Sequence, residues 1–328
     1  MGDNLDNSLK RTHYVIFIMA ISLLSLYFTD MHFMLCREAK GASLSLLLHG
    51  SADVPFQYRV LIPWGIKFLL NLHLPFLNST IRLFKIIEFF FTFFLFVAFR
   101  FYLSIFIQNE IRSSLFSILL FLVLPYQYIF YSASLRAIYY PCDIPSVFFF
   151  TMGIILIYRK NWFLYYPLFI IATFNRETTI FLVFIFWVTT IEKNRTANVF
   201  IHCILQIMIW LIIKKTLGIL YANNPGPGYF INFLFINLKM LLNPVNAVRV
   251  LSSFCFVWGA VVLYFKHISE PFVKKSLAVL IPFGTGMLIV GNIIELRIYG
   301  EMIPVVLSAF AMILNSLFSS CNISKNEG

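Results

Sequence analysis

Charged side chains that could do chemistry stand at the ends of long apolar stretches of this sequence. Asp30 follows the first such stretch, and Arg59 lies in Pro55–Pro63 between aromatic residues and prolines. A carboxylate at the edge of a partly dry cavity can act as a general base. An arginine offers five donors in a fixed fork that fits a phosphate group. A simpler interpretation is also open, in which Asp30 ends its helix in water and Arg59 reaches lipid headgroups.

Three further groups of charges occupy turns between apolar stretches. They are Arg136 and Asp143 around Tyr139-Tyr140-Pro141, Arg176 and Glu177 in Asn175–Thr178, and Glu295, Arg297 and Glu301 before Pro304. Charges at such places in a membrane protein are usually paired or functional. In one interpretation Asp143 caps a helix and the other charges neutralise one another. In the other, the arginines hold a phosphate group and the acids position a sugar or the arginines.

The elements that carry these residues must be membrane-spanning helices. Of the 328 residues, 60 % are apolar and only 12 % are charged, and the mean hydropathy is +0.85. Because soluble chains are about 25 % charged, this chain has too little polar surface to cover a globule in water. The composition excludes disorder, a coiled coil, a collagen-like chain and a disulfide scaffold. The net charge of +11 is spread between apolar stretches and forms no basic face, which disfavours nucleic-acid binding.

Ten apolar stretches are long enough, or nearly so, to be crossing helices, since a crossing needs about 20 mostly apolar residues. They are 12–29, 86–107, 113–135, 144–158, 161–175, 178–191, 196–213, 250–265, 276–294 and 302–324. The uncharged residues 216–238 are broken by Asn223–Gly228 and predict a loop with interfacial helices. The sequence therefore predicts one all-α, polytopic integral membrane domain over residues 1–328, with long outer loops at 30–85 and 214–249.

The distribution of basic residues sets the expected orientation. With the N-terminus in the cytoplasm, the short inner loops and the two termini hold 11 Lys and Arg. The short outer turns then hold only Arg136, Arg176 and Arg297. This agrees with the positive-inside rule for short loops, although ten more basic residues fall in the two long outer loops, where the rule is weak. We therefore expect both termini in the cytoplasm and the charged turns on the outer face.

Residues Val60–Leu74 allow two topologies. The segment is apolar but short, follows Arg59 directly and is interrupted by Pro63 and Lys67. These features favour an amphipathic helix that lies in the membrane interface. A true second crossing is the alternative, and it would move the following segments to the opposite side.

Three consecutive stretches, 144–158, 161–175 and 178–191, are short for crossing helices. At 1.5 Å per residue they cover roughly 21–23 Å, against a hydrocarbon core of about 30 Å. If their basic ends lie at the inner surface, Asp143, Arg176 and Glu177 lie below the outer surface, which predicts a water-filled vestibule open to the outside. Alternatively, the helices extend past these residues, and the charged side chains snorkel to the membrane surface.

The sequence predicts no cofactor and no metal site. No Walker loop, GxGxxG, HExxH or GxSxG motif is present, and the five cysteines form no CxxC pair, so we interpret them as structural. His32, Cys36, Glu38, His49 and Asp53 lie close together in sequence but are irregularly spaced. A divalent cation is therefore without support.

The layout of the chain resembles the GT-C superfamily of polyprenol-linked membrane glycosyltransferases. The matching features are the first helix ending at Asp30, the long outer loop with His49-Gly50 and Pro55–Pro63, the many short helices, and the segments Tyr140–Pro145, Asn175–Thr178 and Glu295–Tyr299. The resemblance implies transfer of a sugar from a polyprenyl-phosphate carrier on the outer face of the inner membrane, most simply a bacterial one. An acidic residue in the first outer loop acts near the acceptor in that family, which here indicates Asp30.

We therefore predict an integral membrane glycosyltransferase with Asp30 as the base. The residues expected to bind substrate are Arg59, Arg136, Asp143, Arg176, Glu177, Glu295 and Arg297. The expected partners are a polyprenyl-phosphate sugar, membrane lipids and a glycan, lipid or protein acceptor, with no nucleic acid. The alternatives are a transporter or flippase of a lipid-linked or anionic substrate, which Arg100 in the middle of its helix would suit, and a non-catalytic membrane assembly partner.

Overall fold

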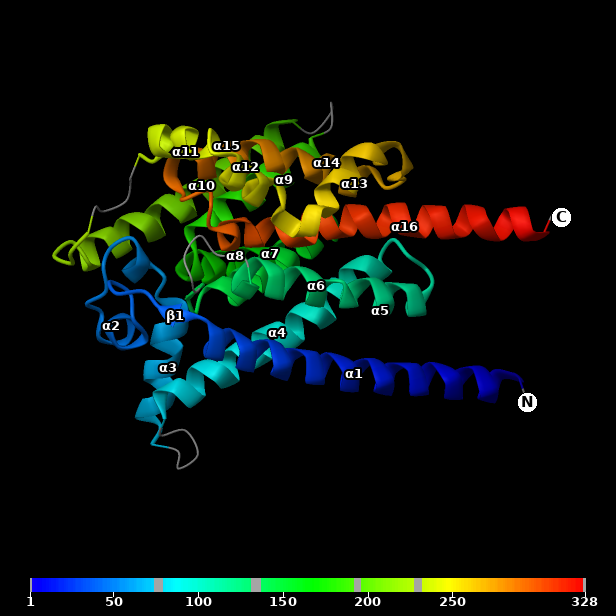
Figure 1. Cartoon of the computed structure of the whole chain (residues 1–328), viewed down its shortest axis with the longest axis horizontal. Coiled ribbons are helices and arrows are strands. Elements are labelled where there is room, and N and C mark those ends of the chain that lie inside the picture. The colour runs from blue at the N-terminus through cyan, green and yellow to red at the C-terminus, as the bar shows by residue number, and fades with distance from the viewer. Residues whose placement is uncertain (1, 74–78, 131–136, 192–195, 227–231, 327–328) are drawn as a thin grey trace.

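The protein is built almost entirely from α-helices, as a computed structural model shows (Figure 1). The structure describes the whole chain except residues 1, 74–78, 131–136, 192–195, 227–231 and 327–328. In the described part the only sheet has two short parallel strands, β1 (Arg37–Glu38) and β2 (Ile138–Tyr139), which pair Arg37 with Ile138 and Glu38 with Tyr139. This sheet ties the end of the first helix to the segment that leads to Asp143.

The α-helices differ widely in length. They are α1 (Gly2–Leu35), α2 (Leu44–His49), α3 (Leu61–Asn71), α4 (Thr80–Ser104), α5 (Glu110–Ile118), α6 (Leu120–Pro125), α7 (Asp143–Tyr158), α8 (Trp162–Asn175), α9 (Ile180–Thr190), α10 (Thr196–Leu220), α11 (Leu234–Leu241), α12 (Pro244–Leu251), α13 (Val257–Leu263), α14 (Pro271–Ser276), α15 (Leu280–Val290) and α16 (Ile303–Asn326). Tight 3₁₀ segments join several of them, among them Glu177–Thr179 before α9 and Leu296–Met302 before α16. The segment Tyr126–Phe130 is a π-helical turn that continues α6.

Six helical segments of the described chain are long and apolar enough to cross a membrane. They are Arg11–Leu35, Thr80–Ser104, Glu110–Phe130, Thr196–Leu220, Pro271–Val290 and Leu296–Ser319. The pair α11 and α12, bent by 102° at its break, would make a seventh. The chain is thus a helical membrane protein, but the expected count of ten crossings is not met. The stretches 144–158, 161–175, 178–191 and 250–265 form shorter helices, because charges and turns end them early.

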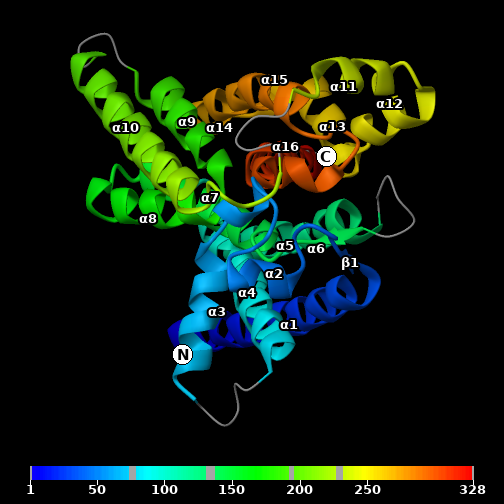
Figure 2. The ribbon, with the colours of Figure 1, turned by 90° about the vertical axis from the view of Figure 1, so that its left-hand side faces the viewer.

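Helix α7 lies at the centre of the molecule, beside α16, as the end-on view shows (Figure 2). Most of its side chains are buried, and it packs against α4, α8 and the segment Leu296–Met302. A helix that is apolar on every side is covered by protein or by lipid, and its burial and packing show that α7 is covered by protein. Its first residue is Asp143, and Pro145 stands in its first turn, where a missing N–H costs no helical hydrogen bond. The central helix therefore begins with a buried carboxylate.

The two termini lie at the same end of the molecule, and α2 and α3 lie at the opposite end (Figure 1). Helix α3 contains only 11 residues, which cover about 16 Å and cannot cross a bilayer of about 30 Å. It buries Ile62, Pro63 and Ile66, while Trp64 and Phe68 are exposed on its other face. This one-sided burial agrees with the interfacial helix expected for Val60–Leu74.

Candidate functional site

The centre of the candidate site is a buried group of three charges from three distant segments. Arg176, at the end of α8, places Nη1 3.2 Å from Asp143 Oδ1 and 3.2 Å from Glu301 Oε1. The side chains of Asp143, Arg176 and Glu301 are at most 4 % exposed. Thr178 donates a 2.6 Å hydrogen bond to Glu301 Oε1. One cation thus lies between two buried carboxylates, an arrangement that is costly unless every member keeps its partner.

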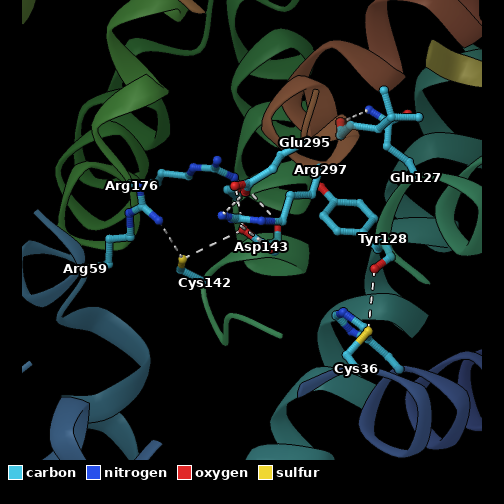
Figure 3. A network of polar contacts seen from close by, with 12 residues as sticks. Cys36, Arg59, Gln127, Tyr128, Cys142, Asp143, Arg176, Glu295 and Arg297 are labelled. Carbon is cyan, nitrogen blue, oxygen red and sulfur yellow. Dashed lines mark hydrogen bonds and ion pairs between the residues drawn. The ribbon is translucent and has the colours of Figure 1, made fainter. Parts of the chain in front are cut away.

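Arg297 extends this group to Glu295 (Figure 3). Its Nη1 lies 3.6 Å from Asp143 Oδ2, and its Nη2 donates to Glu295 Oε2 at 2.7 Å. The guanidinium also lies over the ring of Tyr140, 4.1 Å from its centroid, in a cation–π contact. Asn292 donates to the other oxygen of Glu295 at 2.9 Å. These contacts fix the plane of the guanidinium.

A second charged group adjoins the first. Arg59 donates from Nη2 to Glu177 Oε1 at 3.0 Å, and Lys214 Nζ lies 4.0 Å from Glu177 Oε2. Trp210 donates from its indole nitrogen to the backbone oxygen of Glu177 at 2.8 Å. Burial by itself disfavours the charged form of Arg59, but the neighbouring Glu177 carboxylate outweighs it and raises the pKa of Arg59. Arg59 is therefore a permanent cation.

Arg59 is held in place by a contact between the two long loops. Backbone Val54 donates to Pro225 at 2.8 Å, and Asn224 donates from its amide to the backbone oxygens of Gly50 and Ala52 at 2.9 and 2.8 Å. Gly226 has φ +118°, and a Cβ there would lie 2.4 Å from the backbone oxygen of Val54. This close approach requires glycine, so the loop after α10 fixes the segment that carries Arg59.

The two charged groups line one cavity of about 500 Å³. Four cations reach its wall, Arg59, Arg176, Lys214 and Arg297, against two carboxylates, Glu177 and Glu295. The remaining acids, Asp143 and Glu301, lie behind the arginines and do not line the cavity. The whole group is therefore balanced at four charges of each sign, but the face toward the cavity carries two more positive charges than negative ones. Such a face favours an anionic ligand.

The rest of the cavity wall is apolar. It includes Phe56, Ile180, Phe181, Phe233, Met287, Val290 and Ile298. A groove of about 410 Å³ begins at the same place, because Ile180 and Phe181 line both spaces. The groove runs between α9, α10 and α15 and is lined by apolar residues and Cys203, among them Trp187, Phe200 and Ile204. A ligand with an anionic head and an apolar tail could therefore place its head in the cavity and its tail in the adjoining groove.

The structure brings together six of the residues predicted from the sequence and leaves one of them, Asp30, apart. Arg59, Asp143, Arg176, Glu177, Glu295 and Arg297 meet at the site. Asp30 does not: its side chain is 63 % exposed and accepts a 2.8 Å hydrogen bond from Lys85. Arg136 lies outside the described residues.

Sequence reasoning missed two groups that reach the cavity, Lys214 and Trp210. Both lie in α10, which continues to Leu220, beyond the last residue of the apolar stretch 196–213. The signal was present, since Lys214 lies four residues after Trp210 and therefore on the same helical face. The charge at 214 was instead interpreted as the start of a loop.

Cys142 is the thiol nearest the charged group, 4.0 Å from Arg59 Nη1. Burial raises the pKa of this thiol to about 11, so it is a neutral thiol at physiological pH and a poor nucleophile. Among the residues that the structure describes, no three His, Cys, Asp or Glu gather in a way that could hold a metal ion. The described side chains of the site supply fixed charges and hydrogen-bond donors and acceptors.

Comparison with protein families, curated proteins and solved structures finds no match for this chain.

Proposed function

We propose that the protein is a membrane glycosyltransferase that takes a sugar from a polyprenyl-phosphate carrier, with a GT-C-like organisation. The proposal rests on one observation: the basic cavity and the apolar groove adjoin, because Ile180 and Phe181 line both. A phosphate-linked isoprenoid combines an anionic head with a long apolar tail, which is the combination that these two spaces fit. Phosphate is also the group that an arginine fork holds best.

In this function the arginines stabilise the charge that develops on the phosphate as the sugar leaves. Arg59, Arg176 and Arg297 are held by carboxylates before the ligand arrives, so little reorganisation is needed during the reaction. Glu177 and Glu295 line the cavity and can accept hydrogen bonds from sugar hydroxyls, because each carboxylate has more acceptor positions than its cation uses.

The proposal includes an orientation in a bacterial inner membrane, with both termini in the cytoplasm and the cavity toward the outside. The support is that the termini lie at one end of the molecule and the loop that carries Arg59 at the other (Figure 1). The test is a single cysteine at Asp53 or at Asn322, on a cysteine-free background, labelled in intact cells with an impermeant thiol reagent. Labelling at position 53 alone supports this orientation. Labelling at position 322 alone would show that the protein has the opposite orientation.

The function is tested with the purified full chain in lipid nanodiscs. Binding of farnesyl phosphate is compared with binding of farnesol, which has the same tail without the anionic head. We expect the phosphate to bind more tightly in the wild type and to lose this advantage in Arg59→Gln. Turnover is then measured as release of polyprenyl phosphate from polyprenyl-phosphate hexoses with a glycan acceptor. Equal binding of both probes would contradict the assignment of the cavity.

A transporter or flippase of the same lipid is the second candidate. One observation favours it: both carboxylates that line the cavity are already ion-paired, so neither is an evident base. Phosphate-dependent binding without release of polyprenyl phosphate, together with movement of a fluorescent prenyl phosphate across proteoliposomes, would select this candidate.

A further inference from the structure

Helix α11 packs on α15 through a polar residue (Figure 2). Asn237 is 0 % exposed and is the one buried residue of α11, all of whose residues the structure describes. Its apolar neighbours Phe235 and Ile236 are instead 80 % and 48 % exposed. A polar side chain that faces the interior of a membrane protein is costly unless it has hydrogen-bond partners. The contacts of Asn237 therefore indicate its role.

The amide of Asn237 bonds to the carboxyl end of α15. The last four carbonyl groups of an α-helix have no donor within the helix. Nδ2 of Asn237 donates to the backbone oxygens of Leu288 at 2.8 Å and of Gly291 at 2.7 Å. The backbone nitrogen of Phe233, just before α11, donates to the backbone oxygen of Ile289 at 2.8 Å. Helix α11 thus supplies donors that α15 cannot supply for itself.

Asn237 also holds the turn that follows α15. Its Oδ1 accepts a 3.4 Å hydrogen bond from the backbone nitrogen of Ile293. Together with the bond to Gly291, this contact attaches one side chain to both sides of Asn292. An asparagine side chain offers two N–H donors and one carbonyl acceptor, and all three are used here. The amide of Asn237 therefore fixes the backbone of the turn Gly291–Ile293.

Asn292 connects this turn to the charged wall of the cavity. Its amide nitrogen donates to Glu295 Oε1 at 2.9 Å, and Glu295 Oε2 accepts from Arg297 Nη2 at 2.7 Å (Figure 3). These three residues line the cavity, whereas Asn237 does not. The position of the turn therefore helps to determine where Glu295 lies and, through it, how Arg297 is oriented.

The turn has a second attachment on its other side. The hydroxyl of Tyr299 donates to the backbone oxygen of Ile293 at 3.1 Å. Ile293 is thus held between α11 and the segment Leu296–Met302. Because this second attachment remains when the amide of Asn237 is removed, we expect the turn to shift and not to unfold.

We propose that Asn237 is a positioning residue of the cavity, which holds the turn Gly291–Ile293 and thereby places Glu295 and Arg297 for a phosphate ligand. The nature of the ligand rests on the proposed function, but the contacts of Asn237 do not depend on it. Asn237 touches no ligand in this role and acts through the backbone of the turn. A guanidinium that is held in place before the ligand arrives loses less freedom on binding, which strengthens the binding.

The first test needs no ligand. Nitrogen-15 NMR spectra of the full chain in nanodiscs, with labelled arginine, identify the side-chain signals of Arg297 as those lost in Arg297→Gln. Asn237→Leu has a similar volume without hydrogen-bonding groups and should shift these signals. Asn243→Ala is the matched control, because Asn243 caps α12 in the same bent helix pair and should leave them in place. Unchanged Arg297 signals in Asn237→Leu would overturn the proposal.

The second test measures binding of farnesyl phosphate and farnesol to the same samples. Asn237→Leu should weaken the binding of farnesyl phosphate about 2-fold to 30-fold. The binding of farnesol should not change, whereas a general loss of the fold would weaken both. The effect of Asn237→Leu should disappear when Arg297→Gln is already present, because Asn237 acts through Arg297. An equal loss in the presence and absence of Arg297→Gln would overturn this coupling.

Asn237→Asp tests the hydrogen bonds themselves. Its carboxyl group faces the oxygens of Leu288 and Gly291 and can donate to one of them only when it is protonated. The affinity of this variant for farnesyl phosphate, relative to the wild type at the same pH, should therefore rise as the pH falls. A constant ratio would contradict the role of the amide donors. A wild type that binds both probes equally would reject the proposed function, and the Arg297 signals would still decide the role of Asn237.

Discussion

Two regions of this protein place arginine beside acids inside the helical bundle, and they differ in what surrounds the guanidinium. Arg176 lies between Asp143 and Glu301, both buried, and also lines the cavity. Arg100 lies in α4 near the end of the molecule that holds the termini. It donates from Nε to Ser114 at 2.8 Å and has Nη2 3.7 Å from Glu110, whose side chain is 46 % exposed.

Arg100 also makes cation–π contacts with two aromatic rings. Its guanidinium lies 4.6 Å from the ring centroid of Tyr14 and 5.5 Å from that of Phe17, both on α1. It lines neither the cavity nor the groove. Arg100 therefore joins α1, α4 and α5 as a structural contact, and it no longer favours a transport path. An arginine within a membrane helix indicates a ligand site only where it also faces open space.

The largest expected effect separates these two arginines. Arg176→Gln leaves Asp143 and Glu301 buried without their shared cation, which costs about 3–5 kcal/mol of stability. Arg100→Gln loses a partly exposed pair, worth about 0–1 kcal/mol, and two cation–π contacts, each worth about 0.5–1 kcal/mol. Thermal unfolding in detergent, followed by near-UV circular dichroism, measures both. Adding Glu301→Gln to Arg176→Gln should recover part of the loss, and equal losses in the two single variants would remove the distinction.

The next effect concerns ligand binding without loss of the fold. Arg59→Gln keeps Lys214 beside Glu177, so this partly exposed carboxylate retains a cation. A charge-assisted hydrogen bond contributes about 1.5–3 kcal/mol, so the affinity for farnesyl phosphate should fall about 10-fold to 150-fold. Lys67→Gln, an exposed cation on α3, is the control and should change the affinity little. A similar decrease in both variants would mean that only the overall charge attracts the ligand.

A smaller effect tests the packing behind the site. Gly300→Ala places a methyl group against the Tyr128 hydroxyl, and overpacking of this kind costs about 1–3 kcal/mol. Gly284→Ala in α15 meets no atom within 4 Å and should instead add about 0.5–1 kcal/mol of stability, as alanine does in helices. Combining Gly300→Ala with Tyr128→Phe should lower the cost, and strict additivity in that double variant would show that the two residues do not touch.

The smallest effect is expected at Asp30. Its pair with Lys85 is exposed on both sides, and such pairs contribute about 0–1 kcal/mol. Asp30→Asn should therefore leave stability nearly unchanged, and turnover as well, because Asp30 does not line the cavity. A loss of turnover with normal binding would instead return the role of base to Asp30, as its position in the first outer loop predicts.

Much of the candidate site could be predicted from the sequence because its members are charges within apolar stretches. Asp143, Arg176 and Arg297 are conspicuous there, since each needs a partner in a low-dielectric interior. The pairing could not be predicted, because it depends on how α7, α8 and the segment before α16 meet. Two residues apart on a helix, Asp30 and His32 must lie on different sides of α1. The sequence does not tell which of the two faces Glu88 and which faces outward.

The sequence by itself determined that this is a helical membrane protein, because composition and hydropathy depend only on which residues are present. It also determined which residues carry charge in the membrane. Only the tertiary structure decided how many helices have spanning length and which charges share a cavity. The physical reason is that ion pairs and cavities also join residues far apart in the chain, such as Arg176 and Glu301, and the order of residues does not determine which of them meet.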